Sequence, residues 1–172
     1  VKIYEIDDED VQSYHINKTQ IRANKGSEIT HYRFSLGGKL LRNDTNVIMD
    51  GQEVTANLYG VVVAKDKELY DNHTLIDHAL PNCYSNEVYK SVLNGQAKNV
   101  FNGKIIVRKD AQKTNAYQQN KNLLISNDAV VNAKPQLEIF ADDVKCTHGA
   151  TVGQLDKDGL FYLLSRGIDR NL

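Results

Sequence analysis

The sequence predicts an all-β domain, and it favours a parallel β-helix over a β-sandwich. Strand-sized segments return about every ten residues, and the stretches between them are rich in Gly, Asn and Asp. Helical periodicity is nearly absent before Leu155. Several segments are apolar on both faces, and many turns pair one Gly or Asn with charged residues, which suits stacked coils better than the hairpins of a sandwich.

The clearest strand is THYRFSL, in which Thr30, Tyr32, Phe34 and Leu36 alternate with polar neighbours. This two-residue period is typical of a half-buried strand. Further strands are predicted in the segments TANLYGVVVA, NGKIIVRKDA, NLLISNDAVV and QLEIFADDVKC. The chain also contains 17 asparagines. Because Asn tolerates the left-handed conformation, we expect these residues at the corners of the coils.

Near the C-terminus the pattern changes to that of a short helix, predicted over 157–166. Asp156 is a suitable N-cap, Asp158 lies in the first turn and Gly167 suits the position after the last turn. Two interpretations stay open for its apolar stripe. In one, the helix covers the open end of the β domain; in the other, it begins a further helical region, and the two are compatible. The predicted organisation is therefore a β-helix core over 1–154 and the start of a C-terminal helical region over 155–172.

Composition excludes several classes of function. The 172 residues carry a formal net charge of -1, so no electrostatic attraction to nucleic acid or to an anionic membrane is expected. No segment has the length of a membrane span or the pattern of a signal peptide. Two cysteines are too few for a disulfide framework, which favours a cytoplasmic protein with free thiols. The chain begins at Val1 without a methionine, as expected of a fragment or a processed piece.

Cys146 and His148 are the first candidate site. Two residues apart on a strand, they share one face, with Cα atoms about 7 Å apart. A thiolate and an imidazole suit zinc, copper or iron–sulfur chemistry, but a closed site usually needs four ligands. The alternative is that Cys146 fills the interior as a small apolar residue and His148 is a solvated histidine at the rim.

A second candidate comprises His73, Asp77, His78 and Cys83. On a strand the two histidines would face opposite sides, and their spacing matches no zinc motif, so structural positions are the favoured interpretation. The polar segment 109–122 is expected to be a solvated face. The acidic run 5–12 is expected to be a surface loop, and Asp142 and Asp143 a turn.

The segments VFNGKIIVRKDAQKTNAYQQNKNLLIS and KPQLEIFADDVKCTHGATVGQLD carry a family resemblance. Together with the rest of 71–168 they resemble the core of the SufB/SufD family of iron–sulfur cluster assembly proteins, and the Cys-x-His within KCTHGATVG resembles the SufD branch. The resemblance implies a right-handed parallel β-helix and a non-catalytic scaffold. It also implies pairing with a SufB-like paralogue, binding of a SufC-like ATPase, and a homodimer when the paralogue is absent.

The same resemblance implies site residues. His148 would lie at the interface with the paralogue as a metal or cluster ligand, with Cys146 as a second candidate, and the partner would complete the site. Any cluster or iron would be transient and shared, and none would be bound by this chain alone. The residues expected to contact partners lie on the strand after His148 and on the terminal helix: Ala150, Thr151, Val152, Leu160, Phe161 and Leu164.

Two other functions stay open from the sequence. An extracellular carbohydrate-active enzyme on a β-helix would use paired carboxylates, although few aromatic residues are present for sugar stacking. A purely structural, self-assembling solenoid would need no site at all.

Overall fold

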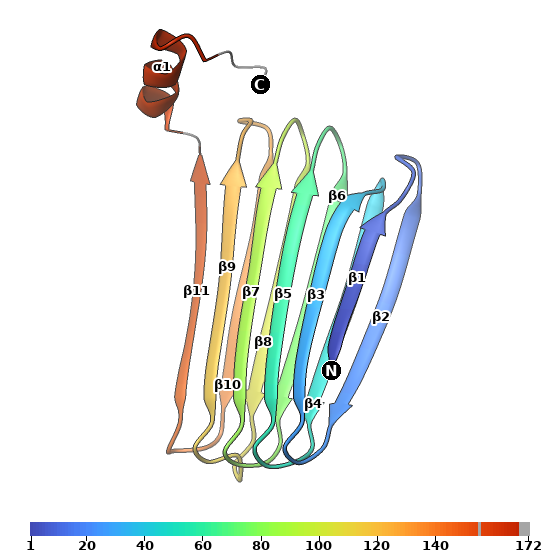
Figure 1. The fold of residues 1–172 in the computed structure, drawn as a ribbon, viewed down its shortest axis with the longest axis vertical. Helices are drawn as coiled ribbons and strands as arrows, with labels where there is room; N and C mark the ends of the chain where they lie inside the picture. The colour runs from blue at the N-terminus through green and yellow to red at the C-terminus, as the bar shows by residue number, and fades with distance from the viewer. Residues whose placement is uncertain (155, 169–172) are drawn as a thin grey trace.

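Eleven strands and one helix make up the part of the chain that the computed structural model describes, residues 1–154 and 156–168 without the side chain of residue 157 (Figure 1). The elements are β1 (Lys2–Asp8), β2 (Tyr14–Ala23), β3 (Glu28–Gly37), β4 (Leu40–Met49), β5 (Thr55–Ala64), β6 (Leu69–His78), β7 (Tyr84–Leu93), β8 (Lys98–Val107), β9 (Asn115–Leu124), β10 (Val130–Ile139), β11 (Lys145–Gln154) and α1 (Lys157–Ser165).

The strands form two parallel sheets that alternate along the chain. Odd-numbered strands make a six-stranded sheet in the order β1-β3-β5-β7-β9-β11, and even-numbered strands make a five-stranded sheet in the order β10-β8-β6-β4-β2. Leu40 pairs with Leu69 and Leu69 with Lys98, so these coils advance by 29 residues. The chain winds as a right-handed coil (Figure 1). The predicted parallel β-helix is confirmed, and the sandwich alternative is wrong because every ladder between these strands is parallel.

The lower corners, which lead from the five-stranded to the six-stranded sheet, share a backbone feature. Gly26, Glu53, Asn82 and Lys113 all have positive φ, and each stands two residues before the next strand. One left-handed residue at an equivalent place turns the chain in four successive coils. The expectation that asparagines make these corners is wrong. Among the described residues twelve asparagines lie on strands and four between them.

Many asparagines face the interior instead, where parallel register stacks them. Asn17, Asn43 and Asn72 are in register on β2, β4 and β6, and Asn43 and Asn72 are buried. A stack of identical amides allows hydrogen bonds along the axis of the solenoid, as from Asn43 Nδ2 to Asn72 Oδ1 at 3.4 Å. The apolar core lies beside this polar row, with residues such as Val47, Ile76 and Ile105 fully buried.

The strand β3 confirms the two-residue period of THYRFSL, but the buried set is the polar one. His31, Arg33 and Ser35 are buried, whereas the alternating Tyr32, Phe34 and Leu36 are more exposed. The tyrosine ring stacks with its neighbours on the outer face of the sheet, at 4.8 Å from Tyr4. Polar side chains can occupy the interior here because the adjacent strand supplies partners of opposite charge.

Those partners come from the acidic run 5–12, which is not a surface loop over its first residues. Glu5 and Asp7 lie on β1. Asp7 Oδ1 accepts a hydrogen bond from Arg33 Nη1 at 3.1 Å, and Glu5 contacts both Arg33 and His31. The buried guanidinium therefore explains why two carboxylates alternate inward on the first strand.

The terminal helix α1 begins as predicted and ends close to the predicted position. The Asp156 side chain accepts a hydrogen bond from the Asp158 N–H at 3.0 Å, and Gly167 has positive φ after the last turn. The helix lies beyond the upper end of β11 (Figure 1), and its apolar residues Phe161 and Leu164 are exposed. The covering of the open end that one interpretation expected is therefore not seen. The residues 155 and 169–172 of the predicted helical region lie outside the described residues.

No helix in the described residues is long and apolar enough to cross a membrane.

Candidate metal and partner site on the last strand

The strand β11 is the last of the six-stranded sheet and pairs only on one side in the described part of the chain. Its ladder runs to β9 in continuous register from Lys145 with Asn115 to Gln154 with Leu124. An unpaired edge presents a row of backbone N–H and C=O groups to any strand that approaches. Within the described residues this edge of β11 is open to an approaching strand.

Register fixes the direction of Cys146 and His148. Cys146 is in register with Ala116 and His148 with Gln118, and both of these β9 side chains are buried in the solenoid. The two candidate ligands therefore share the inward face, as the sequence predicts. They differ in burial, because Cys146 is half-buried against the apolar core whereas His148 is exposed at the open end.

The burial of Cys146 affects its chemistry. Burial raises the pKa of its thiol, against a lowering by the backbone of Ala116. A thiol with a raised pKa stays protonated at neutral pH and is a weak nucleophile. The structure thus brings the two candidate ligands to one face but makes His148 the accessible one.

A polar row continues from His148 into the solenoid. Gln118 is 1% exposed, and its Nε2 donates to Oε2 of Glu87, which is 0% exposed, at 2.6 Å. Burial raises the pKa of Glu87 to about 7, and the side chains of Thr74 and Gln118 oppose the rise. The sequence analysis names neither residue as part of a site, and the expectation that 109–122 is a solvated face is wrong for Gln118, which is buried on β9. The signal was its two-residue period, in which Ala116, Gln118 and Asn120 alternate inward on β9.

The second sequence candidate is not a metal site. His73 faces outward on β6 with its Nε2 2.9 Å from Asp71 Oδ1, whereas His78 faces inward and is fully buried. Burial lowers the pKa of His78 to about 4, although Asp77 opposes this, and its Nε2 lies 2.9 Å from Ser85 Oγ. The predicted opposite orientation of the two histidines is confirmed.

The remaining members of that candidate have separate partners. Asp77 accepts two hydrogen bonds from Arg108, at 2.9 and 2.6 Å, and Cys83 is buried at a corner. Residues 1–154 and 156–168 contain no group of three His, Cys, Asp or Glu side chains that could hold a metal. The turn assigned to Asp142 and Asp143 is confirmed between β10 and β11, where Asp143 forms an ion pair with Lys113.

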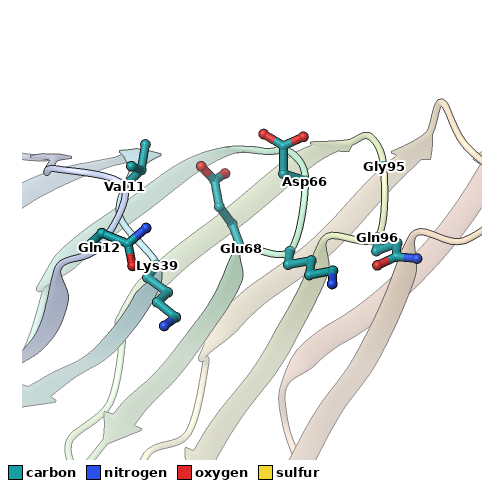
Figure 2. A pocket seen from close by; sticks show the side chains of 8 residues that line it. Val11, Gln12, Lys39, Asp66, Glu68, Gly95 and Gln96 are labelled. Atoms are coloured by element: carbon teal, nitrogen blue, oxygen red, sulfur yellow. The ribbon is translucent and has the colours of Figure 1, made fainter.

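A hollow of about 620 Å³ lies far from these residues, along the upper corners of the coils. Figure 2 shows its lining, which comes from four separate turns and mixes Lys39, Asp66 and Glu68 with Gln12 and Gln96. The lining carries side chains of both charge signs, and none of the sequence-predicted site residues belongs to it. The candidate ligands therefore lie near the start of β11 and not in this groove.

Comparison with known proteins gives the family. Residues 1–172 match the family described as SUF system FeS cluster assembly, SufBD core domain. The chain belongs to the SufBD family. Its relatives include the iron-sulfur cluster assembly protein SufD of Escherichia coli (strain K12), which is 37% identical over 158 residues, covering 92% of this chain and 37% of the relative. This agrees with the SufB/SufD resemblance read from the sequence.

Two further SufBD relatives show the same pattern. An iron-sulfur cluster assembly SufBD family protein of Synechocystis sp. is 37% identical over 91% of this chain and 35% of its own length. One from Mycobacterium leprae is 33% identical over 90% of this chain and 41% of its own length. The chain thus spans less than half the length of these SufBD proteins.

Proposed function

We propose that this SufBD chain is the core of a non-catalytic, SufD-like scaffold subunit of an iron–sulfur cluster assembly complex in the cytoplasm. It pairs with a SufB-like paralogue through β11 and binds a SufC-like ATPase through the helical region that begins with α1. The observation that carries the proposal is an exposed imidazole, His148, on an unpaired edge strand of a SufBD core. A second protein that pairs with this edge would meet that imidazole.

A comparison of the two C-terminal edge strands, β10 and β11, supports β11 as the strand that pairs with another protein. β10 contains Pro135, which has no N–H to donate, and it also contains the charged residues Lys134 and Glu138. Proline and charges on an edge strand discourage pairing with another strand. β11 has neither Pro nor a charged residue between Cys146 and Gln154, and Ala150, Thr151 and Val152 are exposed. In the absence of the paralogue, the same edge would form a homodimer.

The chemistry of the donor set fits a shared site. His148 and Cys146 offer at most two ligands, and Cys146 is half-buried with a raised thiol pKa. A closed four-ligand site therefore needs donors from another chain. Iron or a nascent cluster is the cargo of such a complex, and this chain would contribute His148 as its main ligand. Because the site forms only on docking, metal binding would stabilise the complex by mass action.

The exposed apolar residues of α1 support the second contact. Phe161 is 72% exposed and Leu164 is 40% exposed, and both lie on a helix of nine residues. Together with Leu160, which is partly buried, they form the surface we assign to the ATPase. Large apolar side chains left exposed on a helix indicate a protein–protein contact.

Co-purification with the paralogue and the ATPase tests the proposal. Val152 is 54% exposed on β11, so Val152→Lys would place an unpaired charge inside the paired edge, and we expect it to abolish capture of the paralogue. Val61→Lys is the matched control, because Val61 is 39% exposed on the outer face of β5, and it should capture the paralogue as the wild type does. A wild-type chain that captures neither protein and only self-associates would instead support a purely structural solenoid.

A further inference from the structure

The strand next to His148 carries a buried acceptor without a partner. Gln118 Oε1 is buried and makes no hydrogen bond. Other buried polar atoms of the described residues also lack partners, but they belong to strands β2 to β8, and Gln118 is the only such residue on β9, the strand that pairs with β11. It is also the β9 residue in register with His148.

The orientation of this amide is fixed by two neighbours. Glu87 accepts from Nε2 on the side of β7, so the amide oxygen of Gln118 points away from that hydrogen bond. On the opposite sheet Gly103 has no side chain, and a Cβ there would lie 2.4 Å from Gln118 Nε2. The amide thus occupies space that only glycine leaves free. While Glu87 is ionised and can only accept, the amide cannot turn over without losing its bond to that carboxylate.

His148 is within reach of that oxygen. Adjacent parallel strands lie about 4.8 Å apart, and residues in register on the same face stand side by side. The His148 ring is exposed, so it can change rotamer without displacing packed neighbours. Turning it inward would satisfy a buried acceptor that is otherwise unpaired, which is a favourable exchange.

We propose that Gln118, held by Glu87, is a positioning residue that accepts a hydrogen bond from His148 Nδ1–H. This bond fixes the neutral tautomer whose free Nε2 faces the open end of the solenoid and the incoming partner. The inference rests on the proposed function for its purpose, because a histidine ligand needs its second nitrogen held by an acceptor. The hydrogen bond itself is independent of whether iron ever binds.

The test reads the tautomer directly from the ¹⁵N chemical shifts of the His148 ring, at a pH where the ring is neutral. The wild-type chain should show Nδ1–H as the main tautomer. Gln118→Met keeps the size of the side chain but removes the acceptor, and the Nδ1–H tautomer should become the minor one. Asn120→Leu is the control, since Asn120 is also inward and buried on β9 but is in register with Ala150, so it should leave the tautomer as in the wild type.

A second variant, Gln118→Glu, distinguishes a positioning role of Gln118 from a role in folding. Gln118→Glu retains an oxygen beside His148, with one proton shared between two adjacent carboxyls, so it should restore the Nδ1–H tautomer that Gln118→Met loses. In the complex with the paralogue and ATPase, Gln118→Met should lower iron retention about tenfold, as expected when the partner of a histidine ligand is removed.

The outcomes separate the two claims. An unchanged tautomer in a folded Gln118→Met chain, or a Gln118→Glu chain that behaves as Gln118→Met does, would overturn the inference. A tautomer that changes while iron retention stays constant supports the hydrogen bond and counts against the ligand role of His148 in the proposed function.

Discussion

The buried carboxyl of Glu87 makes the stability of the folded chain depend on pH. Its side chain is fully buried, and one of its carboxyl oxygens, Oε1, has no hydrogen-bond partner. Burial raises its pKa from 4.5 to about 7. A carboxyl whose pKa is higher in the folded state binds its proton more tightly there than in the unfolded chain. The folded state is therefore penalised as pH rises from about 4.5 through about 7.

This gives a prediction for Glu87→Gln. The variant should match the wild type in stability below pH 4.5 and exceed it above pH 7 by at most about 3.5 kcal/mol, since each pKa unit corresponds to about 1.4 kcal/mol. Urea unfolding of both chains at a series of pH values measures the difference, in which the other titrating groups cancel. A difference that does not change with pH would show that Glu87 titrates normally.

At the residue scale, the sequence predicts which candidate ligands share a face of a strand, but it does not predict which face is buried. The shared face of Cys146 and His148 and the opposite faces of His73 and His78 follow from the strand period alone. The inward direction of Arg33 and Gln118 does not, because an alternating strand does not say which of its faces is the interior. Register with β1 and β7, which places carboxylates beside them, decides it.

At the scale of secondary structure, the sequence predicts strands and the terminal helix better than it predicts the residues at the corners. β3, β5, β8 and the helix with its N-cap have a local signal that predicts them. The predicted segments NLLISNDAVV and QLEIFADDVKC are wrong as single strands, because each contains the end of one strand, a turn and the start of the next. The corners are less predictable, since the left-handed residues at 53, 82 and 113 are Glu, Asn and Lys. Only the asparagine suits that conformation. Their position is set by the coil length that keeps neighbouring strands in register.

Gly60 tests how tightly the interior is packed around Tyr89. On β5 it is in register with Tyr89 on β7, and a Cβ at Gly60 would lie 2.2 Å from that ring. Tyr89 is buried and packs with Phe101 at 5.0 Å between ring centroids, so it has little room to move. Gly60→Ala should therefore destabilise the chain by about 1–3 kcal/mol, as overpacking does.

Gly149→Ala is the matched control for Gly60→Ala. Gly149 also lies on a strand of the same sheet, but nothing is within 4 Å of a Cβ there. Both changes restrict the unfolded chain equally, so the difference in melting temperature reports crowding alone. Equal melting temperatures would mean that the space around Tyr89 is not closely packed.

At the scale of the whole molecule, the solenoid is a rigid support with one chemically distinct edge. Parallel coils contact mainly their neighbours, so a row of side chains can run from the interior to an exposed end. Here that row is Glu87, Gln118 and His148, and it ends on the strand whose outer edge is unpaired. The family resemblance carried by KCTHGATVG points to this strand, whereas the strand pattern and the Cys-x-His spacing alone do not. The row behind it depends on pairing between strands about 30 residues apart, for which a single sequence holds no local signal.

The central claim is that a second protein completes the site at His148, and the iron and acid-labile sulfide content of the co-expressed complex tests it most directly. The comparison is between wild type, His148→Ala and His73→Ala, where His73 is a surface histidine on β6 paired with Asp71. We predict that His148→Ala loses most of the iron and sulfide while His73→Ala retains both. Equal content in the wild type and the His148→Ala complex would contradict the claim.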